Sequence, residues 1–316
     1  MTAARITAIL CTYNRYEMAS DAIASLLRQR DVPFRLIVVD NSPDDACAAA
    51  FASKYPGREI TILRQTQAGL ARARNTGLAS CDAEFVAFID DDAVADPLWL
   101  CEIVNAFDRS AADVAVAGGK VVPRWEAPRP AWLPDSALTY LSLVDLGERA
   151  RELVGREWLA GTNIAFRTER LRDAGGFSVH LGRAGGGQNL MSNEETEAMR
   201  RIMAGGHRAF YQPAAIVEHR IGADRLTRQW FRRRVAWQCV SDFMVDPEFA
   251  RRRASGAERA ASRRGRLRRG SAAERFRREL KSVYAETADL LSGGMLATER
   301  QPRGKLAAIL RLTQRR

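Results

Sequence analysis

The stretch FVAFIDDDAVADPLWL, residues 85–100, joins a short apolar run to three consecutive aspartates. The run at 85–89 has the length and composition of a buried β-strand. Asp90, Asp91 and Asp92 follow it directly. Because neighbouring carboxylates repel one another unless a cation neutralises them, the stretch predicts a divalent cation at the end of this strand, with Mg²⁺ or Mn²⁺ favoured by hard oxygen ligands. The competing interpretation is that the aspartates cap the next helix and keep a loop solvated.

On either side of this stretch, the first half of the chain alternates short apolar runs with amphipathic segments. Strands separated by helices of ten or so residues indicate βαβ units and a mainly parallel central sheet flanked by helices, so the expected fold class is α/β. The expected strands are 6–11, 34–40, 59–64, 84–90 and 114–122. The expected helices are 17–29, 43–55, 69–81 and 97–109.

The second half is less regular. Segment 158–177 predicts a strand and then a short helix that ends at its Gly-Gly pair. Residues 192–206 predict a helix with acids in the first turn, and 208–221 predict a strand that Pro213 breaks.

Two segments of special composition predict loops that close over a ligand. Segment 123–137 carries four prolines and two tryptophans, and 182–187 is rich in glycine. Loops of this kind are able to exclude water from a bound substrate. Trp125 and Trp132 suit either loop packing or contact with an acceptor.

Composition excludes several classes of protein. The chain has 316 residues, 46% hydrophobic and 28% charged, which is ordinary for a globular protein. We find no apolar run of about 18 residues and no secretory signal, so no spanning helix is expected. The five cysteines form no CxxC pair, which predicts neither a disulfide framework nor a zinc site and favours a reducing cytoplasm.

The net charge of +11 is concentrated near the C-terminus. From residue 225 onward there are 24 Lys+Arg and 9 Asp+Glu, a net +15, whereas the preceding residues carry a net −4. The change predicts a boundary between residues 1–222 and a basic, mainly helical region at 223–316. That region suits a solvated extension or peripheral contact with an anionic membrane at the inner face. Nucleic acid is not expected, because no base-reading module accompanies the charge.

Polar side chains gather where the predicted parallel strands end, which is where open α/β sheets bind ligands. An aromatic ring, arginines, single carboxylates and an aspartate cluster suit a nucleotide with a divalent metal. No GxGxxG follows the first strand and no GxxxxGK[ST] occurs, so metal and side chains must hold the phosphates. The side chains expected at this crevice are Thr12, Tyr13, Asn14, Arg15, Asp40, Asn41, Ser42, Arg72, Arg74, Asn75, Asp90, Asp91 and Asp92.

Six motifs occur in an order and spacing that resemble family 2 glycosyltransferases with the GT-A fold. They are ITAILCTYNR, IVVDNSPDD, QAGLARARNTG, FVAFIDDDAVADPLWL, AGTNIAFRTERLRDAGGF and SNEETEAMRR. The resemblance covers roughly residues 5 to 221 and implies that 1–222 is the catalytic domain. It implies an inverting transferase that moves a sugar from a nucleoside-diphosphate sugar, UDP-sugar favoured, to an acceptor glycan, lipid or protein.

The resemblance also implies roles in donor binding. Asp90 is expected near the ribose and Asp92 on the metal, with Asp91 between them. Thr12, Tyr13 and Asp40 are expected to line the nucleobase pocket, with Asn14 and Arg15 following on the same turn. Arg74 is expected to reach toward the base or the diphosphate.

The catalytic base is expected in the Glu-Glu pair of SNEETEAMRR. The second acid of such a pair is the family's base, which implies Glu195, where Glu replaces the more usual Asp and leaves Glu194 as the alternative. His219 is expected as a further metal ligand. The position at a helix N-terminus is expected to favour the ionised form of Glu195. A single base and no protein nucleophile predict one displacement with inversion.

Two other functions fit parts of the pattern. A non-catalytic sugar-nucleotide-binding protein would have lost the acids, and here they are all present. A nucleotidyltransferase also uses paired acids on an α/β sheet, but the Gly-rich nucleotide loop typical of that class is missing near the N-terminus.

Overall fold

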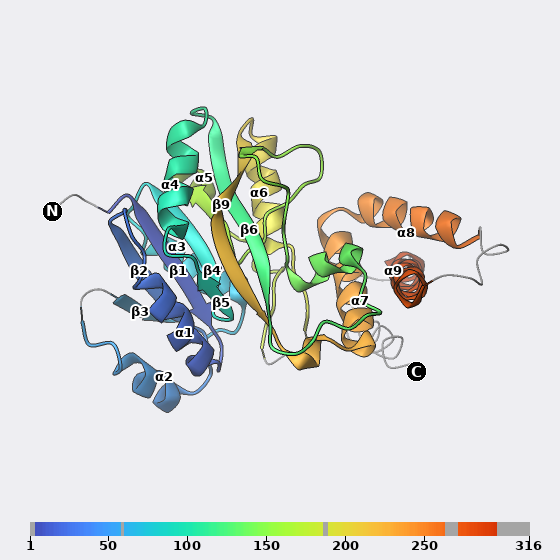
Figure 1. The fold of residues 1–316 in the computed structure, drawn as a ribbon, viewed down its shortest axis with the longest axis horizontal. Helices are drawn as coiled ribbons and strands as arrows, with labels where there is room; N and C mark the ends of the chain where they lie inside the picture. Colours follow the sequence, from blue (N-terminus) through green and yellow to red (C-terminus); the bar gives the residue numbers. More distant parts are fainter. Residues whose placement is uncertain (1–3, 58–59, 186–188, 263–270, 296–316) are drawn as a thin grey trace. The chain divides into compact units, whose positions relative to one another are not determined.

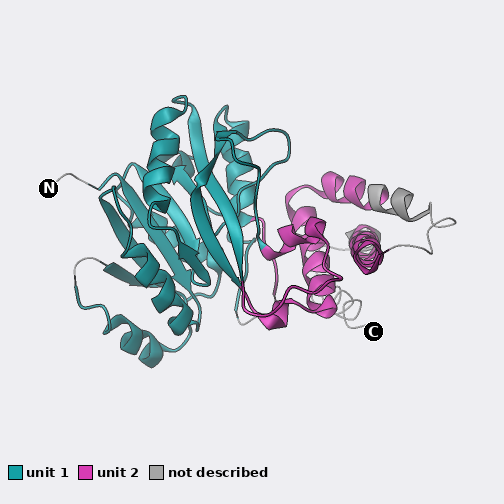
Figure 2. Cartoon of the chain, viewed as in Figure 1, with its two compact units in different colours: residues 1–124, 142–188, 194–220 teal, residues 125–141, 189–193, 221–316 magenta. Residues whose placement is uncertain are grey.

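The computed structural model describes residues 4–57, 60–185, 189–262 and 271–295. The chain forms two compact units, coloured separately in Figure 2. Unit 1 comprises 1–124, 142–188 and 194–220, and unit 2 comprises 125–141, 189–193 and 221–316. The chain passes from unit 1 to unit 2 for the last time after residue 220, two residues before the predicted boundary at 222. Unit 2 also includes two segments from earlier in the chain.

Unit 1 contains the predicted βαβ units. Strands β1, β2, β3 and β4 pair in parallel, in the order β3-β2-β1-β4. Their bounds are β1 Ile6–Thr12, β2 Phe34–Asp40, β3 Ile60–Arg64 and β4 Phe85–Asp90. The helices of this half are α1 Tyr16–Leu26, α2 Asp45–Ala52, α3 Leu70–Ala79 and α4 Trp99–Arg109.

The parallel pairing ends at β4, so the expectation of a mainly parallel sheet is wrong for the second half. β8 pairs with β4 antiparallel, and the sheet continues β8-β6-β9-β5, with β7 paired to β9 (Figure 1). The bounds are β5 Ala93–Ala95, β6 Val114–Trp125, β7 Arg151–Glu152, β8 Ile164–Arg167 and β9 Arg208–Ile221. Two helices complete this half, α5 Thr168–Asp173 and α6 Glu194–Ala204.

Pro213 does not break the last strand, contrary to prediction. β9 runs through it, pairing with β7 at Phe210 and Tyr211 and with β5 from Val217 to His219. Pro213 lies between these two paired stretches, where a missing N–H is tolerated. The uninterrupted strand therefore places His219 opposite Ala93, the first residue of β5.

Helices pack on both faces of the parallel strands. On one face, Ile6 and Leu10 of β1 share a buried cluster with Ile23 of α1 and Trp99 of α4, two helices that lie on the same side of the sheet in Figure 1. On the other face α3 approaches closely: a Cβ added at Gly77 would lie 2.7 Å from Ile9 Cγ2. The sheet is therefore buried on both faces, as its continuous apolar strands predict.

Unit 2 is mainly helical. Its elements are η1 Asp135–Leu141, η2 Ala223–Arg225, α7 Arg228–Val245, α8 Pro247–Ser262 and α9 Ala272–Met295. Trp132 packs edge-on against Phe231 of α7 and Phe276 of α9, with ring centroids 6.0 and 4.7 Å away. Parts of the predicted basic region, 263–270 and 296–316, lie outside the described residues. No helix in the described ranges is both long and apolar enough to cross a membrane.

Candidate active site

The parallel strands end together and bring the predicted residues to one edge of the sheet. In register, Thr12 of β1 lies opposite Asp40 of β2, and Cys11 lies opposite Asp90 of β4. Three segments far apart in sequence therefore supply polar side chains to one region, as open α/β sheets do at their ligand sites.

Asp91 is the most buried of the three aspartates, 1% exposed. Its Oδ2 accepts hydrogen bonds from Thr12 Oγ1 at 2.8 Å and from Arg15 Nε at 3.1 Å. Burial raises the pKa of Asp91 to about 7, with Arg15 acting in the opposite direction and Asp92 adding to the rise. Asp91 thus ties the turn after β1 to the end of β4.

Asp92 lies beside His219, although 126 residues separate them in the sequence. The carboxylate Oδ1 is 3.3 Å from His219 Nε2, and Oδ2 accepts from Arg15 Nη1 at 2.9 Å. The pairing of β5 with β9 places them, because Ala93 lies opposite His219 and the Arg220 amide donates to the Asp92 carbonyl at 2.9 Å. The two predicted metal ligands are together.

The donor set at Asp92 and His219 fits a metal shared with substrate. No three His, Cys, Asp or Glu side chains in the described parts of the chain form a group able to hold an ion. The Asp92 carboxylate and the His219 imidazole, with side chains 5% exposed each, nonetheless place two donor atoms of the kind that binds metals 3.3 Å apart. Because Mg²⁺ at phosphate-transfer sites is commonly held by one or two carboxylates together with substrate phosphates, a set of few protein ligands is compatible with such an ion.

Asp40 is fully buried and its carboxylate is held from three directions. The Ser42 amide donates to Oδ1 at 2.9 Å, Tyr16 Oη donates to Oδ2 at 3.1 Å, and Arg64 Nη1 is 3.3 Å from Oδ2. These bonds fix the loop that follows β2 at the edge of the site.

Arg74 of α3 is buried and connects the aspartate run to α6. Nη2 donates to Asp90 Oδ1 at 3.0 Å and to the Gly161 carbonyl at 3.1 Å, and Nη1 donates to Glu194 Oε1 at 2.9 Å. A Cβ at Gly161 would lie 2.7 Å from Arg74 Nη2, so glycine leaves the space that the guanidinium fills. Arg74 is 2% exposed and its guanidinium is occupied by protein partners.

Glu194 and Glu195 begin α6 and differ in environment. Glu194 is 4% exposed, and its Oε1 is paired with Arg74. Glu195 is half-buried, and burial together with the adjacent Glu194 charge raises the pKa of Glu195 to about 8, against the lowering effect of Arg74. A backbone hydrogen bond at the helix N-terminus lowers the pKa, which is the expected direction, but desolvation outweighs it and the net pKa of Glu195 is raised.

Two predicted residues lie at the margin of this network. Tyr13 is half-buried, and Asn14 is exposed with a φ of 54°. The Asn14 amide donates to Ser42 Oγ at 2.8 Å, which connects the turns after β1 and β2.

Two residues that hold Asp40 were not predicted, namely Tyr16 and Arg64. Arg64 ends β3 and lies opposite Asp40 in the parallel register. The rule that identified the other strand ends would have identified Arg64 had it been applied to this strand. Tyr16 directly follows the predicted Arg15, but its hydrogen bond to Asp40 has no pattern in the sequence.

The comparisons with known proteins identify similar glycosyltransferases. Residues 7–133 match Glycosyl transferase family 2. The chain is 29% identical over 249 residues to the glucosyl-dolichyl phosphate glucuronosyltransferase of Haloferax volcanii, with 77% of each chain covered. It is 30% identical over 198 residues to the pre-mycofactocin glycosyltransferase of Mycobacterium tuberculosis, covering 58% of this chain and 37% of that protein.

Solved structures share the fold at lower identity. The mannosyltransferase PcManGT from Pyrobaculum calidifontis aligns with a TM-score of 0.53 and 20% identity, covering 97% of this chain and 79% of that one. TarS from S. aureus aligns with a TM-score of 0.51 and 19% identity, covering 84% and 44%. The fold is that of GT-A glycosyltransferases, and the molecule is a glycosyltransferase. Residues 7–133 carry the glycosyl transferase family 2 match, and the similarity to glycosyltransferases extends beyond them.

Proposed function

We propose that the protein transfers a sugar from a nucleoside-diphosphate sugar to an acceptor hydroxyl, with inversion, using a divalent metal and a carboxylate base. The observation that carries this is the chain of bonds from Asp90 through Arg74 to Glu194, which joins the donor side of the site to the start of α6. These bonds hold the start of α6, where Glu195 lies, in a fixed position relative to the end of β4, and fixed positions of donor and base favour a single displacement.

The proposed donor site comprises the strand ends and the metal pair. Asp90, with a partly exposed side chain, is assigned to the ribose, and Asp92 with His219 to the metal. The ion would offset the charge that develops on the leaving diphosphate. PcManGT was solved with GDP-Man and Mn²⁺, which supports a nucleoside-diphosphate sugar with Mn²⁺. A thermal-shift screen of UDP-sugars and GDP-sugars with metal present tests our preference for UDP.

The structure favours Glu195 over Glu194 as the base. Glu194 is paired with the buried Arg74, so taking up a proton there would weaken an ion pair. Glu195 is adjacent, and none of its carboxylate oxygens forms an ion pair with a described residue. Its raised pKa suits proton transfer near neutral pH. We assign Glu195 as the base that accepts the proton of the attacking acceptor. We assign Glu194 the role of positioning α6.

Replacing Asp92 with alanine is expected to reduce donor hydrolysis by about a hundredfold or more, because the variant removes a proposed metal ligand. Chelation with EDTA should reduce the wild-type rate by a similar factor, and added Mn²⁺ should restore it. Donor hydrolysis followed by nucleoside-diphosphate release checks both. A rate insensitive to EDTA and to Asp92→Ala would refute the metal assignment.

Turnover is expected to rise with pH through the titration of Glu195. A base acts in its ionised form, and burial beside Glu194 keeps Glu195 mainly protonated below a pKa of about 8. Desolvation is the largest cause of this raised pKa, the adjacent Glu194 and the more distant Asp90 add to it, and Arg74 lowers it. The kcat profile should rise about tenfold per pH unit well below the midpoint and level off above it. A flat profile would contradict the assignment.

The acceptor class and location remain proposals. We propose a glycan, lipid or protein acceptor, and a cytoplasmic protein with peripheral contact with an anionic membrane through the basic region. A nucleotidyltransferase would release pyrophosphate and a non-catalytic binder would release no product, so product analysis after incubation with a nucleotide sugar distinguishes the three.

A further inference from the structure

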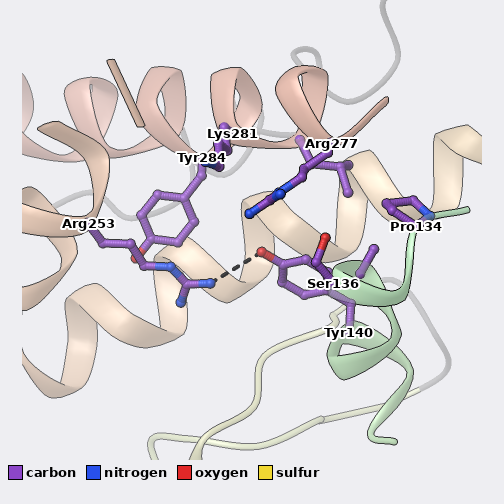
Figure 3. Close-up of a pocket in the computed structure, with 9 residues that line it drawn as sticks. Pro134, Ser136, Tyr140, Arg253, Arg277, Lys281 and Tyr284 are labelled. Atoms are coloured by element: carbon purple, nitrogen blue, oxygen red, sulfur yellow. Dashed lines mark hydrogen bonds between the residues drawn. The ribbon is translucent and has the colours of Figure 1, made fainter. Parts of the chain in front are cut away.

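A pocket within unit 2 combines positive charge with tyrosine rings. It has a volume of about 290 Å³ and lies between η1, α8 and α9 (Figure 3). Its lining residues are Pro134, Ser136, Ala137, Tyr140, Arg253, Arg277, Leu280, Lys281 and Tyr284. No residue of this lining is acidic, although three are cationic.

The four lining positions on α9 belong to one helical face. Arg277, Leu280, Lys281 and Tyr284 are spaced at i, i+3, i+4 and i+7, so the helix presents them together. Neither Arg277 nor Lys281 forms a hydrogen bond or ion pair with any residue that the structure describes. Two uncompensated cations on one wall of a pocket favour an anionic occupant.

Asp242 holds Arg253 in position through a hydrogen bond. Asp242 Oδ2 accepts from Arg253 Nη1 and from Tyr284 Oη, both at 2.7 Å. Arg253 Nη2 donates to Tyr140 Oη at 3.2 Å, which leaves the Tyr140 hydroxyl proton available. In Figure 3, the guanidinium groups of Arg253 and Arg277 both point toward this hydroxyl. Because Asp242 neutralises Arg253, the charge left in the lining is that of Arg277 and Lys281.

We propose that this pocket is a phosphate-binding site, in which Arg277 and Lys281 pair with the phosphate oxygens and the Tyr140 hydroxyl donates to them. A phosphate monoester carries a charge of about −1.5 to −2 at pH 7, which matches the two free cations. Arginine forms paired hydrogen bonds with phosphate oxygens in one plane. The rings of Tyr140 and Tyr284, with Leu280, offer an apolar wall to the group that carries the phosphate. The source of the phosphate is a lipid headgroup or a free phosphorylated compound.

The test uses the full chain, with EDTA present so that no metal contributes. Inorganic phosphate is titrated by calorimetry, and sedimentation is measured with vesicles of phosphatidylcholine alone or mixed with phosphatidate. The double variant Arg277→Ala/Lys281→Ala is expected to weaken binding by about tenfold or more. Arg277→Lys/Lys281→Arg should retain it, because both charges remain. The matched control is Arg275→Ala/Arg278→Ala, which removes the same charge from α9 outside the pocket and should change binding less than about twofold.

Each outcome decides the proposal. Binding of inorganic phosphate that depends on Arg277 and Lys281 supports the site and identifies a free phosphate group as sufficient. Binding to phosphatidate vesicles alone, with the same dependence, supports it with a lipid headgroup as the source. The proposal is overturned if neither probe binds, or if the double variant and its control bind equally. The experiment measures binding in the absence of metal, so its result does not depend on whether the protein transfers a sugar.

Discussion

Replacing Glu195 with glutamine should lower turnover by about 10²- to 10⁴-fold while leaving the affinity for the donor nucleotide unchanged. Glutamine keeps the size and hydrogen-bonding shape of the side chain but has no basicity, so the acceptor hydroxyl would keep its proton. Donor binding is proposed to depend on the strand ends and on Asp92, which the change does not alter. Transfer to acceptor measures the first effect, and calorimetric titration with nucleoside diphosphate and Mn²⁺ measures the second.

A matched control is Glu169→Gln, which neutralises another carboxylate in the first turn of a helix. Glu169 is exposed at the start of α5 and forms no bond with the site residues, so its replacement should leave transfer unchanged. Retained transfer in Glu195→Gln together with loss in Glu194→Gln would assign the proton to Glu194. Retained transfer in both variants would remove the carboxylate base from the proposal.

Local sequence patterns predicted the elements of both halves of the fold, but they did not predict the antiparallel pairing of the second half. The strand expected at 34–40 is β2 at those bounds, because a continuous apolar run between polar turns has few alternatives. The antiparallel pairing of β4 with β8 joins Phe85 to Arg167, and nothing near either residue specifies the other. Pro213 misled the prediction because proline removes a donor, and whether a donor is needed depends on the neighbouring strand.

For the site as well, features set by neighbouring residues were predicted, and features set by distant residues were not. The aspartate run was visible in the sequence, but the inward direction of Asp91 depends on Thr12 and Arg15, which come from another strand end. The rise in the Glu195 pKa was missed for a related reason. A helix N-terminus is a local feature that favours a carboxylate, whereas the burial that outweighs it is created by the rest of unit 1.

Replacing Arg74 with methionine should destabilise unit 1 by about 3–5 kcal/mol, because it leaves the carboxylate of Glu194 buried without its partner. Methionine has a comparable length and no charge, so lost packing contributes little. Asp90 would lose the same partner, and the bonded path from the donor side to α6 would be cut. Urea unfolding monitored by circular dichroism gives the free-energy change, and transfer assays at low temperature show whether the surviving folded fraction is active.

An exposed arginine–carboxylate ion pair is the control that separates the effect of burial from the loss of an ion pair. Arg35 and Asp82 are 2.6 Å apart with side chains 60% and 64% exposed, so Arg35→Met should cause a far smaller loss, as solvent already screens that pair. The double variant Arg74→Met/Glu194→Gln should recover part of the stability lost in Arg74→Met, because the remaining side chain no longer carries an unpaired buried charge. Two results would contradict this prediction: equal stability of Arg74→Met and Arg35→Met, or no gain in stability in the double variant relative to Arg74→Met. Either would mean that the bonds from Arg74 to Asp90 and Glu194 do not contribute to the free energy of unfolding. The case for Glu194 as the residue that positions Glu195 would then fall with it.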